Sequence, residues 1–305
     1  MVDVRARRPV APEDVAAVRA LAEAAAAADG HPSLSDAVWA DLVEPGDGTM
    51  LLLADEGIDP VGALHLAARP DGALTATVVV HPDHREGGVA TALVQAALRE
   101  VSATGGGHVV LWAFGADDRS DAFAASVGFT PERELWQMRV PLPLLETPHR
   151  PDGVRVRTFV PGCDEARWLE VNNRAFADDP DQGGWTEGML RDRAAEPWFD
   201  PSGFLLAVDD THAIVGFCWT KVHPPHPPYE PDALGEIYVI GVDPSSQGRG
   251  LGRALVLAGL ASLHERGIGM GMLFVDASNA PAIGLYKALG FRVSRVDRAY
   301  GRDVE

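Results

Sequence analysis

The chain has 305 residues, 46% of them hydrophobic and 23% charged, a globular balance that excludes disordered, collagenous and coiled-coil chains. Its 44 acidic and 26 basic side chains give a formal net charge of −18, so the summed field repels phosphate backbones and anionic membranes. We therefore expect no nucleic-acid or membrane partner, and at roughly 150 residues per domain we expect two domains.

The first half of the chain alternates strand and helix patterns in a regular order. Its expected elements are a strand at 2–7, a helix at 12–29, an antiparallel pair at 50–55 and 61–67, a strand at 73–80, a helix opening at 85–90 and ending near 103, a strand at 109–113, a helix from 120 and a strand after 129. Between the strand at 73–80 and its helix lie the turn His81-Pro82 and a glycine-containing loop.

The same order returns 162 residues later. Its expected elements are a strand at 154–158, a helix at 164–177, an antiparallel pair at 204–209 and 214–221, a strand at 234–242, a helix opening at 247–252 and ending near 266, a strand at 272–276, a helix from 280 and a strand after 291. Gln247 follows Arg85, and Gly290 follows Gly128, by the same 162 residues, so no gap is needed across the block. The chain is thus predicted to hold two copies of one fold.

Hairpin-like strands combined with helices indicate the α+β class. We expect two tandem domains, each a mixed, mostly antiparallel sheet flanked by helices, over residues 1–140 and 154–305. The segment 141–153 between them contains four prolines and is predicted to be a stiff linker.

The glycine-rich loop of the second copy, Gln247-Gly-Arg-Gly250-Leu-Gly252-Arg, is a candidate anion site. It follows a strand and opens a helix, where unpaired backbone N–H groups and the positive end of the helix dipole point outward. Glycines allow close approach of a pyrophosphate, and Arg249 and Arg253 supply positive charge. By itself the loop could also be a tight turn with solvated arginines, because neither dinucleotide nor P-loop spacing is present.

Residues on the C-terminal side of the loop make its interpretation more specific. A Q/R-x-x-G-x-G/A block after a strand, Asn279 about thirty residues later and the closing Leu-Tyr286-x-x-x-Gly-Phe291 resemble the acyl-CoA motif of the GNAT N-acetyltransferases. Further segments resemble the mycothiol synthases, a family of tandem GNAT proteins, over essentially the whole chain: Asn172-Asn-Arg-Ala-Phe176, Asp181-Gln-Gly-Gly-Trp185, Trp219-Thr-Lys221-Val-His and Gly235-Glu-Ile-Tyr-Val-Ile-Gly-Val-Asp-Pro244.

The resemblance implies acetyl-CoA as cosubstrate, with its pantetheine arm along the strand before the loop. The implied binding residues of the second copy are Ile240, Gly241 and Val242 through their backbone, Gln247, Gly248, Arg249, Gly250, Leu251, Gly252 and Arg253 around the pyrophosphate, and Asn279, Ala280, Pro281, Ala282, Ile283 and Gly284 on the far side of the arm. In the first copy they are Val78, Val79, Val80, Arg85, Gly88 and Ala90.

Acetyl transfer from a thioester to an amine needs a base for the amine and a proton for the leaving thiolate. Glu236 is a carboxylate in an otherwise apolar strand and is the expected base, acting directly or through water. Tyr286 is the expected proton donor, with Tyr300 as the alternative. A solvated strand glutamate and a core tyrosine are the ordinary interpretations of such residues, and the position in the family pattern favours the catalytic ones.

The repeat is an internal control for these roles. At a spacing of 162, the first-copy counterparts of Glu236, Tyr286 and Asn279 are Leu74, Ala124 and Asp117. The first copy has therefore kept the glycine loop and lost the catalytic groups, and we expect one working site, in the second copy.

The family's acceptor is the amine of a cysteinyl group joined to glucosaminyl-inositol, a small thiol-bearing pseudodisaccharide. By resemblance its ligands are Asp36 from the first half, then Asp181, Lys221, Glu236 and Asp276, although Ser35-Asp36 also has the pattern of a helix N-cap.

Neither of the two cysteines has metal-ligand spacing, and His223-Pro-Pro-His226 is better explained as a rigid rim, so we expect no metal. No apolar run is long enough for a membrane span, which favours a cytoplasmic protein, and we expect a monomer. Two other functions stay open: a tandem GNAT enzyme acting on another amine, such as an aminoglycoside or a peptide N-terminus, and a non-catalytic acetyl-CoA-binding module.

Overall fold

The computed structural model describes residues 2–46, 48–57, 59–69, 71–147, 151–177, 179, 182–227 and 230–305. Its strands are β1 (Asp3–Arg7), β2 (Met50–Glu56), β3 (Asp59–Ala68), β4 (Leu74–Val80), β5 (Gly107–Ala113), β6 (Thr130–Pro141), β7 (Val154–Thr158), β8 (Phe204–Asp209), β9 (Ile214–His223), β10 (Leu234–Val242), β11 (Met270–Asp276) and β12 (Arg292–Val304). Its helices are α1 (Pro12–Asp29), α2 (Asp36–Val43), α3 (Val89–Ala103), α4 (Asp118–Ser126), α5 (Glu165–Ala175), α6 (Glu187–Ala194), α7 (Leu251–Glu265) and α8 (Ala280–Ala288).

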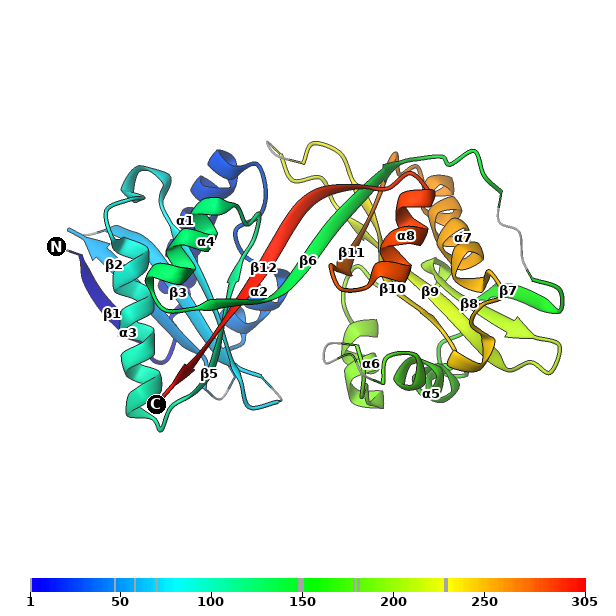
Figure 1. The fold of residues 1–305 in the computed structure, drawn as a ribbon, viewed down its shortest axis with the longest axis horizontal. Coiled ribbons are helices and arrows are strands. Elements are labelled where there is room, and N and C mark those ends of the chain that lie inside the picture. Colours follow the sequence, from blue (N-terminus) through cyan, green and yellow to red (C-terminus); the bar gives the residue numbers. More distant parts are fainter. Residues whose placement is uncertain are drawn as a thin grey trace.

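The described strands form one sheet in the order β1-β2-β3-β4-β5-β12-β6-β11-β10-β9-β8-β7. Only β4 with β5 and β10 with β11 pair in parallel, and the other described ladders are antiparallel. The predicted α+β class with mixed, mostly antiparallel sheets is confirmed. Figure 1 shows two similar halves, each with helices on both faces of its part of the sheet.

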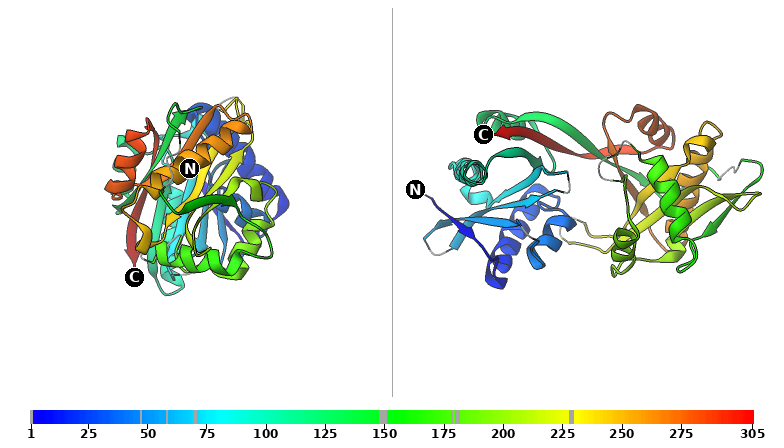
Figure 2. Two further views of the ribbon diagram at one scale, coloured as in Figure 1. Left: turned by 90° about the vertical axis from the view of Figure 1, so that its right-hand side faces the viewer. Right: turned by 90° about the horizontal axis from the view of Figure 1, so that it is seen from below.

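The last strand of each half lies in the sheet of the other half. β6 belongs by sequence to the first half but pairs with β11, whereas the C-terminal β12 pairs with β5, and β6 and β12 pair with each other. Figures 1 and 2 show these two long strands spanning the space between the halves. The exchange joins the halves through backbone hydrogen bonds, so neither half completes its sheet with its own sequence.

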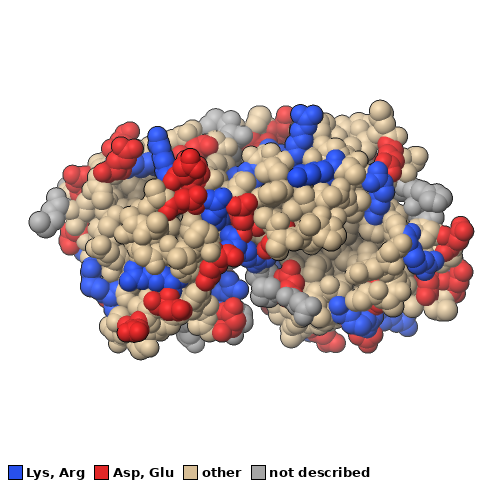
Figure 3. Space-filling view, in the orientation of Figure 1, with Lys and Arg blue, Asp and Glu red and all other residues tan. Residues whose placement is uncertain are grey.

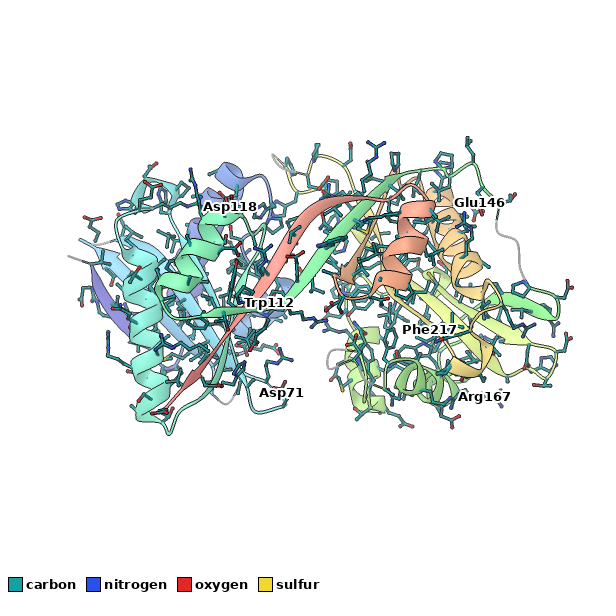
Figure 4. All side chains as sticks on the ribbon, viewed as in Figure 1. Asp71, Trp112, Asp118, Glu146, Arg167 and Phe217 are labelled. Atoms are coloured by element: carbon teal, nitrogen blue, oxygen red, sulfur yellow. The ribbon has the colours of Figure 1, made fainter. Side chains whose placement is uncertain are left out.

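The two faces of each half have separate apolar cores. In the second half, α7 and α8 pack on one face around residues such as Leu255 and Phe291. On the opposite face α5 and α6 cover a cluster of aromatic rings in which Trp168 and Trp219 are fully buried. Because side chains alternate along a strand, β9 sends Phe217 and Trp219 to this aromatic face and Cys218 to the other. Phe217 is labelled in Figure 4, above α5.

Most predicted elements have the expected bounds, including α1, β7, β8 and β10, which match to the residue. Two short helices are not apparent in the sequence. The cap Ser35 does open α2, where its hydroxyl accepts from the Val38 amide at 3.3 Å, and α6 opens in the same way at Thr186. Both helices have only eight residues, so their apolar period is too short to be recognised in the sequence.

Candidate active site

The parallel pair β10 and β11 separates in the middle of the second half. The two strands pair only from Gly235 to Ile237, and a bulge at Tyr238 then shifts the register of β10 against β9. Beyond the bulge, residues 238–242 have no ladder partner on the β11 side, although both strands are fully described. Their backbone is therefore open to an extended ligand in the slot between the strands.

The glycine loop closes one end of this slot. Gly248 and Gly250 adopt left-handed φ values of 76° and 79°, and Gly250 is the N-cap of α7 without a side-chain cap. The first N–H groups of α7 consequently lack intrahelical acceptors and add to the positive end of its dipole. A Cβ on Gly252 would lie 3.9 Å from both Leu285 and Val242, so the helix start, α8 and the end of β10 meet here. These are the three segments that the sequence assigned to acetyl-CoA.

The two arginines of the loop contact the segment between β6 and β7. Arg253 forms two hydrogen bonds with Glu146, from Nε at 2.7 Å and Nη2 at 2.5 Å, and Arg249 donates to the Asp152 carbonyl at 3.3 Å. These groups are at the surface, and Figure 4 labels Glu146 beside the upper end of α7. An anion approaching the loop thus meets an arginine that already has a carboxylate partner.

Glu236 lies on the aromatic face of the sheet beside two basic side chains of β9. It is 7% exposed and stands opposite Lys221 in the antiparallel ladder. His223, paired with Leu234, is its diagonal neighbour, and His223 Nε2 lies 2.6 Å from Glu236 Oε2. Glu236 lies two residues before the bulge at Tyr238, in the last part of β10 that still pairs with β11. Glu236 is therefore a buried carboxylate beside Lys221 and His223 and not a solvated strand glutamate.

Asp36 reaches this group from the other half of the molecule. As the first residue of α2 it accepts a hydrogen bond from Lys221 Nζ at 2.7 Å. The Asp36 side chain itself is 80% exposed. Desolvation near the junction acts to raise its pKa, but the hydrogen bond and charge of Lys221 outweigh that effect and lower the pKa below its ordinary value. The N-cap pattern and the substrate-site prediction for this segment are compatible, because Ser35 caps the helix while Asp36 points to Lys221.

Lys221 is held by aromatic rings as well as by Asp36. Its Nζ lies 4.9 Å from the ring centre of Trp198 and 5.8 Å from that of Tyr238, within the range of cation–π attraction, and the residue is 9% exposed. Burial also raises the pKa of the Tyr238 phenol, so that phenol stays neutral. The result is an acidic, basic and aromatic group of side chains at the junction of the two halves.

Tyr286 lies on α8 and belongs to the core of the second half. Its ring packs against Phe291 at 5.7 Å between centres in the core under α7 and α8, and burial raises the pKa of its phenol to about 12. Among the described residues its hydroxyl has no hydrogen-bond partner. The alternative donor Tyr300 lies in the first half, where it donates to Asp121 at 2.6 Å and belongs to another core. Tyr300 thus lies in the first-half core with its hydroxyl bonded to Asp121, and Tyr286 stays the predicted donor.

Four predicted residues have local structural partners. Asn279 caps α8, where its side-chain oxygen accepts from the Ala282 amide at 3.1 Å. Asp276 accepts from Ser278 and from Arg133 of β6, and although burial acts to raise its pKa, these hydrogen bonds lower it. The side chains of Ile240 and Val242 pack against the core, as the backbone-only role assigned to them requires. Asp181 lies outside the described residues.

Asp276 is on the same sheet face as Glu236 but does not touch it. Met272 is the ladder partner of Glu236, and Asp276 follows four residues later on the same side of β11. At about 3.3 Å per residue this places the two carboxylates on the order of 13 Å apart along the sheet. Asp36, Lys221 and Glu236 are thus one group, and Asp276 is a second group held by Arg133.

The first half repeats the loop geometry without the bulge. Gly88 caps α3 with a φ of 80°, and Arg85 Nε contacts the Val80 carbonyl just as Gln247 Nε2 contacts that of Val242, both at 3.4 Å. However, the register of β3 against β4 runs without a shift, and both hydrogen-bonding ends of Arg85 are taken by Asp29 at 2.6 and 2.8 Å.

The missing bulge corrects one predicted equivalence. In both neighbouring ladders, Leu74 takes the place of Gly235 and Thr75 that of Glu236. The structural counterpart of Glu236 is therefore Thr75 and not Leu74, because the extra residue Tyr238 changes the spacing from 162 to 161 ahead of the bulge. The conclusion that the first half lacks the carboxylate is unchanged.

No group of three or more metal-ligating side chains is present in the part of the chain that the structure describes. Likewise, none of the described helices has the length and apolar character needed to cross a membrane. Figure 3 shows basic and acidic side chains mixed over the visible face, without a broad area of positive charge.

These features agree with comparisons to known proteins. The model of the acetyltransferase (GNAT) family matches residues 16–129 and again residues 167–291. The chain belongs to the GNAT acetyltransferase family. Both glycine loops, the separated parallel strands and Tyr286 fall within these two matches, and membership makes the protein an N-acetyltransferase.

Relatives of similar length show which members of this family the chain resembles. The chain is 48% identical over 94% of its length to the mycothiol acetyltransferase of Thermomonospora curvata and 46% identical over 95% to that of Thermobispora bispora, covering 93% and 97% of those proteins. Among solved structures, a GCN5-related N-acetyltransferase from Sphaerobacter thermophilus has a TM-score of 0.78 at 26% identity, with 100% and 96% of the chains covered. A tandem GNAT protein of the clavulanic acid pathway has the same fold, with a TM-score of 0.76 at 20% identity, covering 100% and 99%.

Sequence reasoning misses three side chains of the site: His223, Trp198 and Tyr238. The proline-rich surroundings of His223 favour a rigid rim. Its spacing from Lys221 puts both on one strand face and could have indicated a role, whereas nothing in the sequence around Trp198 signals its contact with Lys221.

Proposed function

We propose that the protein transfers the acetyl group of acetyl-CoA to the free amine of cysteinyl-glucosaminyl-inositol and so forms mycothiol. The relatives named mycothiol acetyltransferase, which match nearly the whole chain, support this substrate. The single structural observation that carries the proposal is the position of Glu236, buried beside Lys221 at the point where β10 and β11 separate.

The chain's own groups fit acetyl-CoA as cosubstrate. The backbone of 240–242 is open on the side of β11, the N-terminus of α7 provides unpaired N–H groups, and Arg249 and Arg253 add positive charge. We propose that residues 247–253 hold the pyrophosphate and that 279–284 flank the arm. Arg253 would exchange Glu146 for a phosphate oxygen when the ligand binds.

The reaction joins the acceptor nitrogen to the acetyl carbon and breaks the bond from that carbon to sulfur. We propose that Glu236, directly or through one water, takes the proton released by the amine, since a base in the site can be worth 10²–10⁴-fold in rate, as an order of magnitude. Tyr286 gives its phenolic proton to the departing sulfur and is replenished from solvent. Its raised pKa keeps the phenol protonated at neutral pH.

We propose that the acceptor lies at the junction of the halves, against Asp36 and Lys221, with hydroxyl groups extending toward Asp276. The Asp36 carboxylate and the Lys221 ammonium provide one acceptor and one donor 2.7 Å apart, which suits neighbouring sugar hydroxyls. Asp181 remains a proposed ligand by its position in the sequence alone.

The catalytic unit is proposed to be residues 154–305, with 141–153 as linker and 1–140 as a degenerate copy. The absence of a β-bulge in β4 and the pairing of Arg85 with Asp29 support this assignment. Val78 to Val80, Gly88 and Ala90 could still present a loop to acetyl-CoA, but without a carboxylate at Thr75 no turnover is expected there. We also propose a monomeric, cytoplasmic enzyme without a metal.

The test is to present acetyl-CoA with cysteinyl-glucosaminyl-inositol, an aminoglycoside and a short peptide, and to read acetylated products by mass. We expect product only from the cysteinyl pseudodisaccharide. Glu236→Gln should lower kcat by about 10²–10⁴-fold, whereas its matched first-half variant, Thr75→Val, should leave kcat unchanged. Turnover of another amine alone would refute the substrate, and acetyl-CoA binding without any product would favour the non-catalytic module.

A further inference from the structure

The His223–Glu236 pair is the closest contact of the proposed base and has no role in the proposed proton transfers. Glu236 Oε2 is only 2.6 Å from His223 Nε2, which leaves the other carboxylate oxygen for a different partner. His223 is the last residue of β9, and its side chain is 27% exposed, so solvent can reach the imidazole although the carboxylate is nearly closed off. The pair therefore connects a buried base to the surface.

Two further charged groups lie near the His223–Glu236 pair. Lys221 precedes His223 on the same strand face. Asp36 of α2 lies close enough to His223 for the imidazole to help lower the pKa of Asp36. Of the contacts of His223, the one with Glu236 at 2.6 Å is direct, so the role of His223 depends on that carboxylate.

We propose that His223 is a positioning residue for the transfer reaction: its Nε2–H hydrogen bond fixes Glu236 Oε2 and directs Oε1 to the acceptor amine. The proton of the amine goes to Glu236, and His223 neither takes that proton nor touches the substrate. The contact of 2.6 Å is short enough for a charge-assisted hydrogen bond, which holds the carboxylate in one orientation. This inference rests on the proposed role of Glu236.

The first arm of the test is kinetic and uses whichever acceptor the enzyme acetylates. His223→Ala should lower kcat by about 10- to 100-fold with the KM for acetyl-CoA unchanged, because one charge-assisted hydrogen bond is lost. His223→Gln, whose side-chain amide also donates an N–H, should recover most of kcat. His264→Gln, an exposed histidine on α7, is the control and should match the parent enzyme.

The second arm does not depend on turnover and separates this proposal from the proposed function. The Nε2–H proton of His223 is observed by NMR in the full chain and in Glu236→Gln. We expect its signal to move upfield in the variant, because the charge-assisted hydrogen bond to the carboxylate is replaced by a weaker one to an amide. An unchanged Nε2–H signal, an undiminished kcat in His223→Ala, or no recovery of kcat in His223→Gln would each overturn the proposal.

Discussion

Replacing Tyr286 with phenylalanine removes only the hydroxyl group, so its effect on catalysis can be measured apart from any effect on folding. The ring keeps its contact with Phe291 and its place in the core, and the hydroxyl has no partner among the described residues. Loss of an unpartnered hydroxyl should change the free energy of unfolding by no more than about 0.5 kcal/mol. Tyr286→Ala, in contrast, should cost about 3–5 kcal/mol, because it empties a ring-sized space in the core.

The catalytic effect depends on the proton that the phenol can donate. With a pKa of about 12, Tyr286 is ionised at pH 7.5 in roughly 3 molecules per 100,000, so almost every enzyme molecule carries the proton. The burial that weakens the phenol as an acid also raises the proton affinity of a thiolate in the same slot, which preserves the match between them. We expect Tyr286→Phe to lower kcat by about 10²–10³-fold, within the range for a positioned acid.

The assay compares kcat, acetyl-CoA affinity and the thermal midpoint of the parent protein and Tyr286→Phe. Unchanged affinity and midpoint with the expected loss of kcat would assign the effect to the proton. The pKa also predicts that Tyr286 produces no alkaline decline in kcat below about pH 11. A kcat within threefold of the parent would refute the role of the phenol, and a decline near pH 9 that vanishes in the variant would refute the pKa.

Two further predictions concern the junction and the loop. Asp36→Asn should raise the KM for the acceptor and leave that for acetyl-CoA unchanged, as measured by initial rates, because only the acceptor side loses its contact with Lys221. The pKa of Asp36 is lowered in the folded protein, so the contribution of this carboxylate to stability is complete above its unfolded pKa near 3.9. That contribution is lost only as the pH falls through the folded pKa. Unfolding curves at pH 5 and pH 8 should therefore show no difference due to Asp36. Glu146→Gln should tighten acetyl-CoA modestly and less so at high salt in a binding titration, because it frees Arg253. Equal affinity in the two proteins at low salt would show that the surface pair does not compete with the ligand.

The parts of the site that could be predicted from sequence depend on local patterns. The loop at 247–252 was predictable because glycines at left-handed positions, a preceding strand and a following helix are adjacent in the chain. The buried Glu236 was predictable because a carboxylate among apolar residues of one strand is visible in a single segment. Both of these depend on neighbours within about ten residues.

The parts that could not be predicted depend on pairing between distant segments. Nothing in the sequence of β6 or β12 indicates that each strand lies in the sheet of the other half. The strand pattern alone does not tell whether β5 or β11 is the neighbour. The bulge at Tyr238 could not be seen for another reason. The two copies correspond at a spacing of 162 at the end of β10 and again from β11 onward. Only the residues of β10 before the bulge correspond at 161, and that stretch is too short to show in the sequence. The contact of His223 with Glu236 required that diagonal register to be known.

The exchanged strands explain why the first half remains part of the candidate site in the second half. β6 lies beside β11 in the second half, and its Arg133 holds Asp276 on the face shared with Glu236. Through α2 the same half supplies Asp36 to Lys221. The first half carries Thr75 and Ala124 in place of the proposed base Glu236 and the proposed acid Tyr286, yet it completes the sheet and contributes Arg133 and Asp36 to the candidate site. Under these proposed roles, loss of chemistry in the first half is compatible with retention of its fold, because the second half depends on the position of Arg133 and Asp36 and not on turnover in the first.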